Sequence, residues 1–274
     1  MSEMMAGRRG IVLGVANNHS IAWGIAKRLA DEGAELALTY QPPGMDRRVA
    51  PLAASIGCDF VLPCDVSLAP DDDNPAALDN VFAAVAERWG KIDFLVHAIA
   101  YSSRAELAGR YADTSRANFV STMIVSCFSF TEAMKRAAAL MPDRGTAITL
   151  TYLGSNRVMP NYNVMGVAKA ALESSVRYLA VDLGTQNIRV NAISAGPVRT
   201  LAAAGVANAR TIYNFQKRSS PLARTVSIDE IGGSALYLLS GLSSGVTGEI
   251  HYVDTGFNSI AMPIDALATT PEPD

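Results

Sequence analysis

The stretch Gly14–Ala26, GVANNHSIAWGIA, follows a short apolar run and leads into a segment with helical spacing. Ile21, Ile25 and Leu29 recur every four residues, which places them on one face of a helix. The stretch therefore predicts a strand, a tight turn and a helix in succession. Similar short apolar runs follow along the chain, so the strands that we expect are Ile11–Val15, Leu36–Tyr40, Phe60–Leu62, Ile92–His97, Ala147–Leu150, Arg189–Ile193 and Glu249–Val253.

These seven runs are short, often β-branched and without polar alternation, as in strands that are covered on both faces. Segments with helical spacing separate them, as at Leu172, Val176 and Leu179. The alternation predicts an α/β fold: a single-domain, Rossmann-like, doubly wound parallel sheet of about seven strands. We expect one domain over residues 1–274, with a loose C-terminal tail at about 263–274.

The composition excludes several classes of function. Of the 274 residues, 49% are hydrophobic and 18% charged, and the formal net charge is -3. This balance favours a globular protein without general attraction for nucleic acid or anionic membranes. The three cysteines include no C-x-x-C pair and the three histidines lie far apart, so we expect neither a disulfide nor a metal site. No run suits a signal peptide or a membrane span, which predicts a cytoplasmic protein.

The opening turn has two of the three glycines expected in a dinucleotide-binding turn. Gly14 permits a close backbone approach at the strand end, and Gly24 is expected to let helix and strand pack closely. Ser20 is placed to cap the helix and to offer its hydroxyl and N–H to a phosphate. An ordinary strand–helix loop without a ligand has the same residues, and this alternative stays open.

The ends of the second and third strands carry the next candidates. Gln41 stands where an acidic residue would bind the ribose of NAD, so the choice between NAD and NADP stays open. Asp65 is placed to hydrogen-bond an adenine amino group. Arg47 and Arg48 could reach a 2'-phosphate, although an exposed helix face explains them as well.

Three residues after the fifth strand suggest chemistry. Tyr152 stands at the strand end, and Tyr162 and Lys169 start the next helix, seven residues or about two turns apart and roughly 10 Å along the axis. An ammonium near a phenol, with a ribose hydroxyl between them, would orient the phenol toward a developing oxyanion. Alternatively, the tyrosines are packing residues and the lysine is solvated.

The arrangement resembles the short-chain dehydrogenase/reductase superfamily, and the Tyr–Lys spacing is similar to that of its bacterial NADH-dependent enoyl-acyl-carrier-protein reductases. The resemblance runs from Gly10 to about Met262. The stretches that carry it are GVANNHSIAWGIA, GAELALTYQ, CDV, LTYLGSNRVMPNYNVMGVAKAALE, IRVNAISAGPVRTLAA and VTGEIHYVDTGF.

The resemblance implies that NADH delivers hydride to the β-carbon of a trans-2-enoyl thioester, in the last step of the type II fatty acid elongation cycle. Tyr162 would stabilise the enolate, Tyr152 would assist it, and Lys169 would bind the nicotinamide ribose. Ser102 would line the acyl pocket. A homotetramer and acyl carrier protein as partner are implied too. The other cofactor-binding residues implied are Gly14, Ser20, Ile21, Gln41, Asp65, Val66, Ile99, Val198, Arg199, Thr200, Leu201 and Ala202.

A segment at about 199–227 departs from the compact pattern, because small residues lead into a weakly amphipathic stretch. This composition predicts a mobile lid over the substrate, with an ordinary pair of surface helices as the alternative. Five basic residues and no acidic residue lie between positions 199 and 224. This basic segment would attract an acidic carrier protein, unless it is only a solvated face.

Two alternative functions are a carbonyl reductase and a catalytically silent sensor. A carbonyl (3-ketoacyl) reductase on the same scaffold would normally carry a serine thirteen residues before the tyrosine and a lysine four residues after it. Those positions hold Thr149 and Gly166. A catalytically silent NAD-binding sensor is the second alternative, and the presence of both Tyr162 and Lys169 disfavours it.

Overall fold

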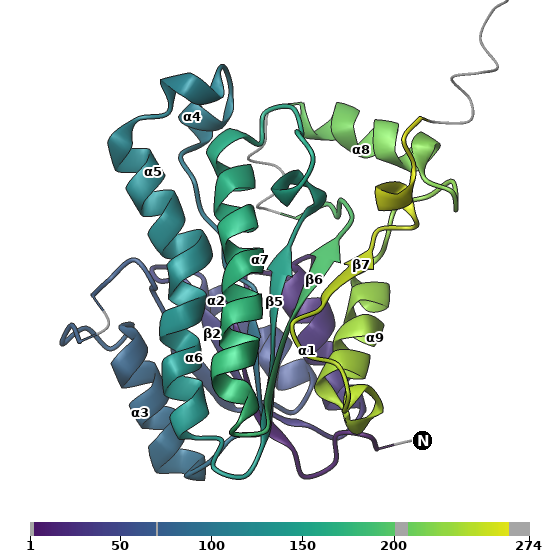
Figure 1. Ribbon diagram of the computed structural model, residues 1–274. Coiled ribbons are helices and arrows are strands. Elements are labelled where there is room, and N and C mark those ends of the chain that lie inside the picture. Colours follow the sequence, from purple (N-terminus) through teal and green to yellow (C-terminus); the bar gives the residue numbers. More distant parts are fainter. Residues whose placement is uncertain (1–2, 70, 201–207, 263–274) are drawn as a thin grey trace, which may run out of the picture.

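A parallel sheet of seven strands forms the centre of the computed structural model, which describes residues 3–69, 71–200 and 208–262 (Figure 1). The strand order is β3-β2-β1-β4-β5-β6-β7. Each predicted strand is present, with its ends shifted by a residue or two. The strands are β1 (Arg9–Leu13), β2 (Glu35–Tyr40), β3 (Phe60–Pro63), β4 (Phe94–His97), β5 (Gly145–Thr151), β6 (Ile188–Ala195) and β7 (Ile250–Val253).

Helices cover both faces of the sheet (Figure 1). Ile11 and Leu13 of β1 pack in a core with α3, α6 and α7, whereas Val12 packs with α1, α2 and α9. This alternation explains why the strands lack a polar face. The helices are α1 (Ile21–Asp31), α2 (Asp46–Ser55), α3 (Leu78–Trp89), α4 (Arg104–Leu107), α5 (Arg116–Met123), α6 (Ser129–Ala139), α7 (Asn163–Gly184), α8 (Ala209–Ser219) and α9 (Ile228–Leu239). Short 3-10 helices are η1 (Tyr111–Asp113), η3 (Leu153–Ser155), η5 (Gly241–Ser243) and η6 (Phe257–Ser259), and η2 (Ile124–Phe128) is a π-helix between α5 and α6.

Gly24 was expected to let α1 pack closely on a strand, and this prediction was wrong. A Cβ at Gly24 would lie 2.7 Å from both the Cβ and the carbonyl oxygen of Ile228 in α9. In return, a Cβ at Gly232 would lie 2.8 Å from the carbonyl oxygen of Gly24. The missing side chain therefore serves helix–helix packing of α1 on α9 rather than packing of α1 on a strand.

The topology places a ligand site at the carboxyl ends of the central strands. The chain runs outward from β1 through β2 to β3, and then returns to pair β4 with the other side of β1. Such a reversal opens a crevice between the loops that follow the two central strands. None of the described helices combines the length and the apolar character that crossing a membrane requires.

Candidate active site

A cleft of about 670 Å³ lies at this reversal and collects residues from loops far apart in the sequence. The loops after β1, β2, β3, β4 and β5 contribute to it, together with the first turns of α7. Most of the predicted cofactor residues line the cleft: Gly14, Ser20, Ile21, Gln41, Asp65, Ile99, Lys169 and Thr200.

The remaining predicted cofactor residues lie elsewhere. Val66 is buried in the core beside the third strand, and Val198 lines a neighbouring cavity. The guanidinium of Arg199 stacks over the ring of Tyr213, 4.7 Å from its centroid. Leu201 and Ala202 lie outside the described residues, as does the predicted tail.

Gly14 is required where β1 turns into the cleft. Its φ is +94°, and a Cβ there would lie 2.5 Å from the carbonyl oxygen of Ala98 and 3.0 Å from Cγ1 of Ile99. Both conditions exclude a side chain, since positive φ disfavours residues with a Cβ and the facing backbone leaves no space for one. The loop after β1 therefore packs directly against the backbone that follows β4, with Gly14 itself lining the cleft.

Ser20 takes the predicted N-cap position of α1, but its side chain does not cap the helix. The hydroxyl instead donates to the carbonyl oxygen of Asn17 at 2.7 Å. Among the described contacts, the N–H groups of Ile21 and Ala22 have no partner. Two free N–H groups at the positive end of a helix form an anion site, which fits the pyrophosphate of a dinucleotide.

The far end of the cleft lies beside Asp65 and Gln41. The Asp65 carboxylate accepts hydrogen bonds from the N–H of Ser67 at 2.9 Å and from its hydroxyl at 2.6 Å. These bonds fix the carboxylate at the cleft wall, where it has acceptor capacity left for a ligand amino group. Arg47 and Arg48 are exposed on α2 and do not line the cleft.

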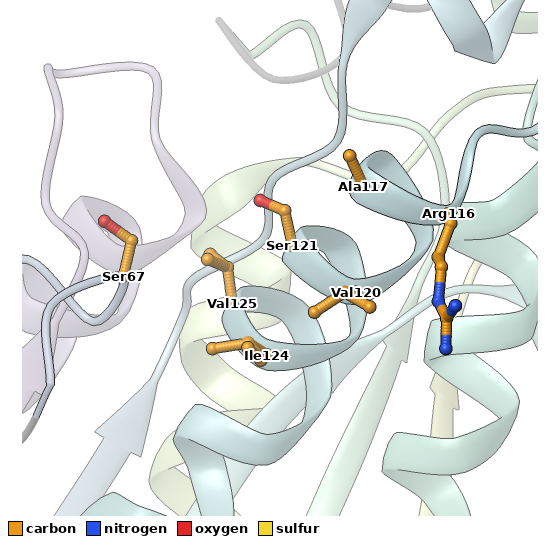
Figure 2. Close-up of a pocket in the computed structure, with 7 residues that line it drawn as sticks. All are labelled: Ser67, Arg116, Ala117, Val120, Ser121, Ile124 and Val125. Atoms are coloured by element: carbon orange, nitrogen blue, oxygen red, sulfur yellow. The ribbon is translucent and has the colours of Figure 1, made fainter.

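An open hollow of about 610 Å³ continues from this end of the cleft along α5. Figure 2 shows Ser67 on its loop across from Ser121 and Val125, which also line the cleft. Its other walls are largely apolar, and among the described residues that line it Arg116 is the ionisable one. Because Ser67, Ser121 and Val125 line both spaces, the hollow is an outer extension of the cleft.

A second cavity, of about 540 Å³, joins the cleft at the two predicted tyrosines. Tyr152 and Tyr162 line both spaces, and their rings meet edge to face with centroids 5.1 Å apart. Ser102 lines the second cavity, and its hydroxyl hydrogen-bonds with Asn118 and Thr122. The other lining is mostly apolar and includes Leu107, Met159, Pro160, Met165, Val198 and Ile212.

Burial keeps both phenols protonated. It raises the pKa of Tyr152 to about 12, although a hydrogen bond from Gln216 opposes the shift. Burial likewise raises the pKa of Tyr162, and the neighbouring Tyr152 and Glu173 add to this effect. A neutral phenol donates a hydrogen bond, so the junction of the two cavities holds two donors and no fixed charge on either phenol.

Lys169 is buried near this junction, but its ammonium does not donate to Tyr162 in the described contacts. Its Nζ lies 2.7 Å from the carbonyl oxygen of Leu150, to which it donates. Burial lowers the pKa of Lys169 to about 8, while the nearby Cys127 and Glu173 oppose the shift. The solvated alternative is therefore wrong, and the side chain is held at the end of β5.

The buried lysine is expected to contribute stability that increases as pH rises from about 8 to about 10. Within that window the unfolded chain binds the proton and the folded protein releases it. Each tenfold change in proton affinity corresponds to ~1.4 kcal/mol, so the full gain is about 3 kcal/mol, and it is absent below pH 8.

The measurement compares the free energy of urea unfolding of the wild type with that of Lys169→Met, which does not titrate, at one protein concentration. The raised pKa values of the buried tyrosines and of Cys64 act in the opposite direction, but they are shared by both proteins, so their contribution cancels. Parallel pH dependences of the two proteins would contradict the expectation.

Gln216 was not among the predicted site residues, yet it reaches the site from α8. Its Nε2 donates to the hydroxyl oxygen of Tyr152 at 2.6 Å, and the side chain is buried. Ile212, one turn earlier, lines the second cavity. Within the predicted lid, α8 therefore has its inner face against the site. The sequence contains no local signal of this contact, because a single glutamine in a basic segment is typical of an exposed position.

The carbonyl reductase alternative meets two obstacles in the structure. The hydroxyl of Thr149, at the serine position, is buried and hydrogen-bonds with Nδ1 of His97 at 3.0 Å, away from the cleft. A Cβ at Gly166, at the lysine position, would lie 2.7 Å from the carbonyl oxygen of Gly154. Neither position can supply the group that this alternative needs.

Comparisons with known proteins agree with this geometry. Residues 14–258 match the family model described as enoyl-(acyl carrier protein) reductase. The chain belongs to this family. A relative from Rhizobium meliloti, enoyl-[acyl-carrier-protein] reductase [NADH] 2, is 62% identical over 97% of this chain and 98% of its own length.

Solved structures of enoyl-acyl-carrier-protein reductases show the same fold. The FabI structure from Candidatus Liberibacter asiaticus has a TM-score of 0.91 at 57% identity, covering 96% of this chain and 100% of that one. The enzyme from Anaplasma phagocytophilum, solved in complex with NAD, has a TM-score of 0.90 at 51% identity, covering 96% of this chain and 98% of its own. The predicted fold class and family are thereby confirmed.

Proposed function

We propose that Tyr162 donates the hydrogen bond that stabilises the enolate oxygen when a trans-2-enoyl thioester is reduced at its β-carbon. The protein is an NADH-dependent enoyl-acyl-carrier-protein reductase, an oxidoreductase acting on a carbon–carbon double bond of intermediates in fatty acid biosynthesis. The observation that carries the residue assignment is the pair of buried, protonated phenols where the cleft meets the apolar cavity.

The cleft fits a dinucleotide in shape and in chemistry. The bare backbone at Gly14 and the free N–H groups of Ile21 and Ala22 would hold the pyrophosphate. Asp65 would bind the adenine, and Lys169 would turn from the Leu150 carbonyl to the ribose near the nicotinamide. Bound NADH supplies the hydride.

The second cavity fits the acyl chain. Its apolar walls would hold the chain and exclude water, while Ser102 lines the wall beside them. Tyr162 and Tyr152 would place their hydroxyls at the thioester oxygen, where negative charge develops during the reaction. Donors that are already in place need no rearrangement at that moment, so they stabilise the transition state more than the ground state.

The basic segment would guide the carrier protein to this cavity. Arg210, Lys217 and Arg218 are exposed on α8, whereas Arg224 forms an ion pair with Glu230. Acyl carrier protein is acidic, so the exposed cations would raise its encounter rate with the cavity mouth. The proposal also includes three further properties: the α8 segment moves as a lid, the protein forms a homotetramer, and it is located in the cytoplasm.

The test is the initial rate of NADH oxidation by the purified protein with a trans-2-enoyl thioester and, in parallel, with a 3-ketoacyl thioester. We expect turnover of the enoyl substrate alone, because Thr149 and Gly166 leave the carbonyl reductase arrangement incomplete. Turnover of the keto substrate would instead assign the protein to the carbonyl reductases. Binding of NADH without either rate would support the silent sensor.

A further inference from the structure

Gln216 links the helix above the active site to one of its two phenols. It lies on the inner face of α8 and is 1% exposed. Its Nε2 is 2.6 Å from the hydroxyl oxygen of Tyr152, a residue 64 positions earlier in the chain. Ser220 donates to the Gln216 carbonyl from its N–H at 2.8 Å and from its hydroxyl at 2.7 Å, which fixes this end of α8.

Packing alone does not explain an amide at this position. The Oε1 of Gln216 is buried and has no hydrogen-bond partner among the described residues. Buried polar atoms are nearly always paired, and an unpaired one destabilises the folded state. An apolar side chain of similar size would fill the space without that cost. The hydrogen bond from Nε2 to Tyr152 is what the amide adds.

The direction of this bond decides which way the Tyr152 proton points. A phenol oxygen accepts a hydrogen bond through a lone pair and donates through its own hydrogen. Because Gln216 occupies the oxygen as a donor, the phenol hydrogen must find its acceptor elsewhere. Tyr152 lines both cavities, so a carbonyl oxygen at their junction is available to accept it once substrate is bound. Donation to the oxygen also strengthens the phenol as a donor.

We propose that Gln216 is a positioning residue which, by donating to the Tyr152 oxygen, keeps the Tyr152 hydroxyl directed as a donor to the substrate thioester oxygen. This inference rests on the proposed function, since it requires that Tyr152 faces the reacting thioester. The glutamine itself does not touch the reacting atoms. It acts from α8, so the placement of this helix and the orientation of the Tyr152 hydroxyl are coupled.

The test replaces Gln216 by glutamate and by methionine in the full chain. An ionised glutamate would accept a hydrogen bond from the Tyr152 hydroxyl and turn it away from the substrate, so enoyl turnover at pH about 8 should fall about 10-fold. Acidification should restore the rate, because a protonated carboxyl can again donate to the Tyr152 oxygen. Burial raises the pKa of such a carboxyl toward the assay range. Gln216→Met, which cannot donate, should lose rate equally at every pH.

Two controls separate positioning from a structural role. Asn214→Asp adds the same charge at an exposed position of α8 and should leave the pH profile of turnover unchanged. In a Tyr152→Phe background, Gln216→Glu should cost no further rate, since the hydroxyl that it redirects is gone. The affinity for NADH, measured by fluorescence titration, should be the same in all variants.

An equal further loss in the Tyr152→Phe background would overturn the proposal, as would wild-type rates and pH profiles in both Gln216 variants. Failure of the proposed function looks different, because the wild-type protein itself would then not reduce the enoyl thioester. If Gln216→Glu does not fold, Gln216→Met is compared in the wild-type and Tyr152→Phe backgrounds. A loss of rate in the wild-type background alone would support the proposal, and equal losses in both would overturn it.

Discussion

Replacement of Tyr162 by phenylalanine is expected to lower kcat for enoyl thioester reduction by about 10²- to 10³-fold, the usual loss when one oxyanion donor is removed. Affinity for NADH should change little, because the ring remains and continues to pack against Tyr152. The measurement is steady-state NADH oxidation together with a direct NADH titration. A loss confined to kcat identifies an interaction that exists only in the transition state.

The matched control is Tyr178→Phe, which makes the same change on the same helix at a side chain that is 73% exposed. Its rate should equal that of the wild type. Tyr162→Phe with kcat within about threefold of the wild type would assign the donor role to Tyr152 alone, because loss of an essential donor costs far more than that.

Replacement of Gly14 by alanine is expected to raise the Kd for NADH by about 10- to 100-fold. The alanine must adopt a positive φ, and its Cβ must push against the Ala98 carbonyl oxygen. Each of these two effects costs about 1–3 kcal/mol. The turn then moves out of the position in which the pyrophosphate can approach it. Calorimetric or fluorescence titration with NADH measures the change.

Gly57→Ala is the matched control for Gly14→Ala. Gly57 also has positive φ, +71°, but nothing lies within 4 Å of its added Cβ. It follows α2, away from the cleft, and its variant should bind NADH like the wild type. Equal losses of affinity in both variants would show that backbone strain, rather than close approach, governs binding.

The strands and the residues at their ends could be predicted from the sequence because their signals are local. A buried parallel strand is a continuous apolar run, and the residues that follow it reach the same sheet edge whatever the helices do. Gly14, Asp65, Tyr152 and Tyr162 all follow such runs, and each lies where this rule puts it.

The contacts that could not be predicted depend on how separate elements meet. Gly24 faces Ile228, and Gln216 faces Tyr152. The residues of each pair lie so far apart in the sequence that the spacing of apolar residues cannot predict their contact. Ser20 has the composition of a cap, yet the carbonyl of Asn17 takes its hydroxyl first. In each case the residue type agreed with the local secondary structure, but its contact was determined by a residue distant in sequence or by a closer hydrogen-bond acceptor.

The packing of α1 on α9 also sets an order for synthesis. The N-terminus of α1, where we propose that phosphate binds, is synthesised well before the helix against which α1 packs, residues 228–239. Between those two points the growing chain carries the turn without the support of α9. Cofactor is therefore expected to assist folding only after α9 has been made, because nascent chains that end before α9 lack this support for the site.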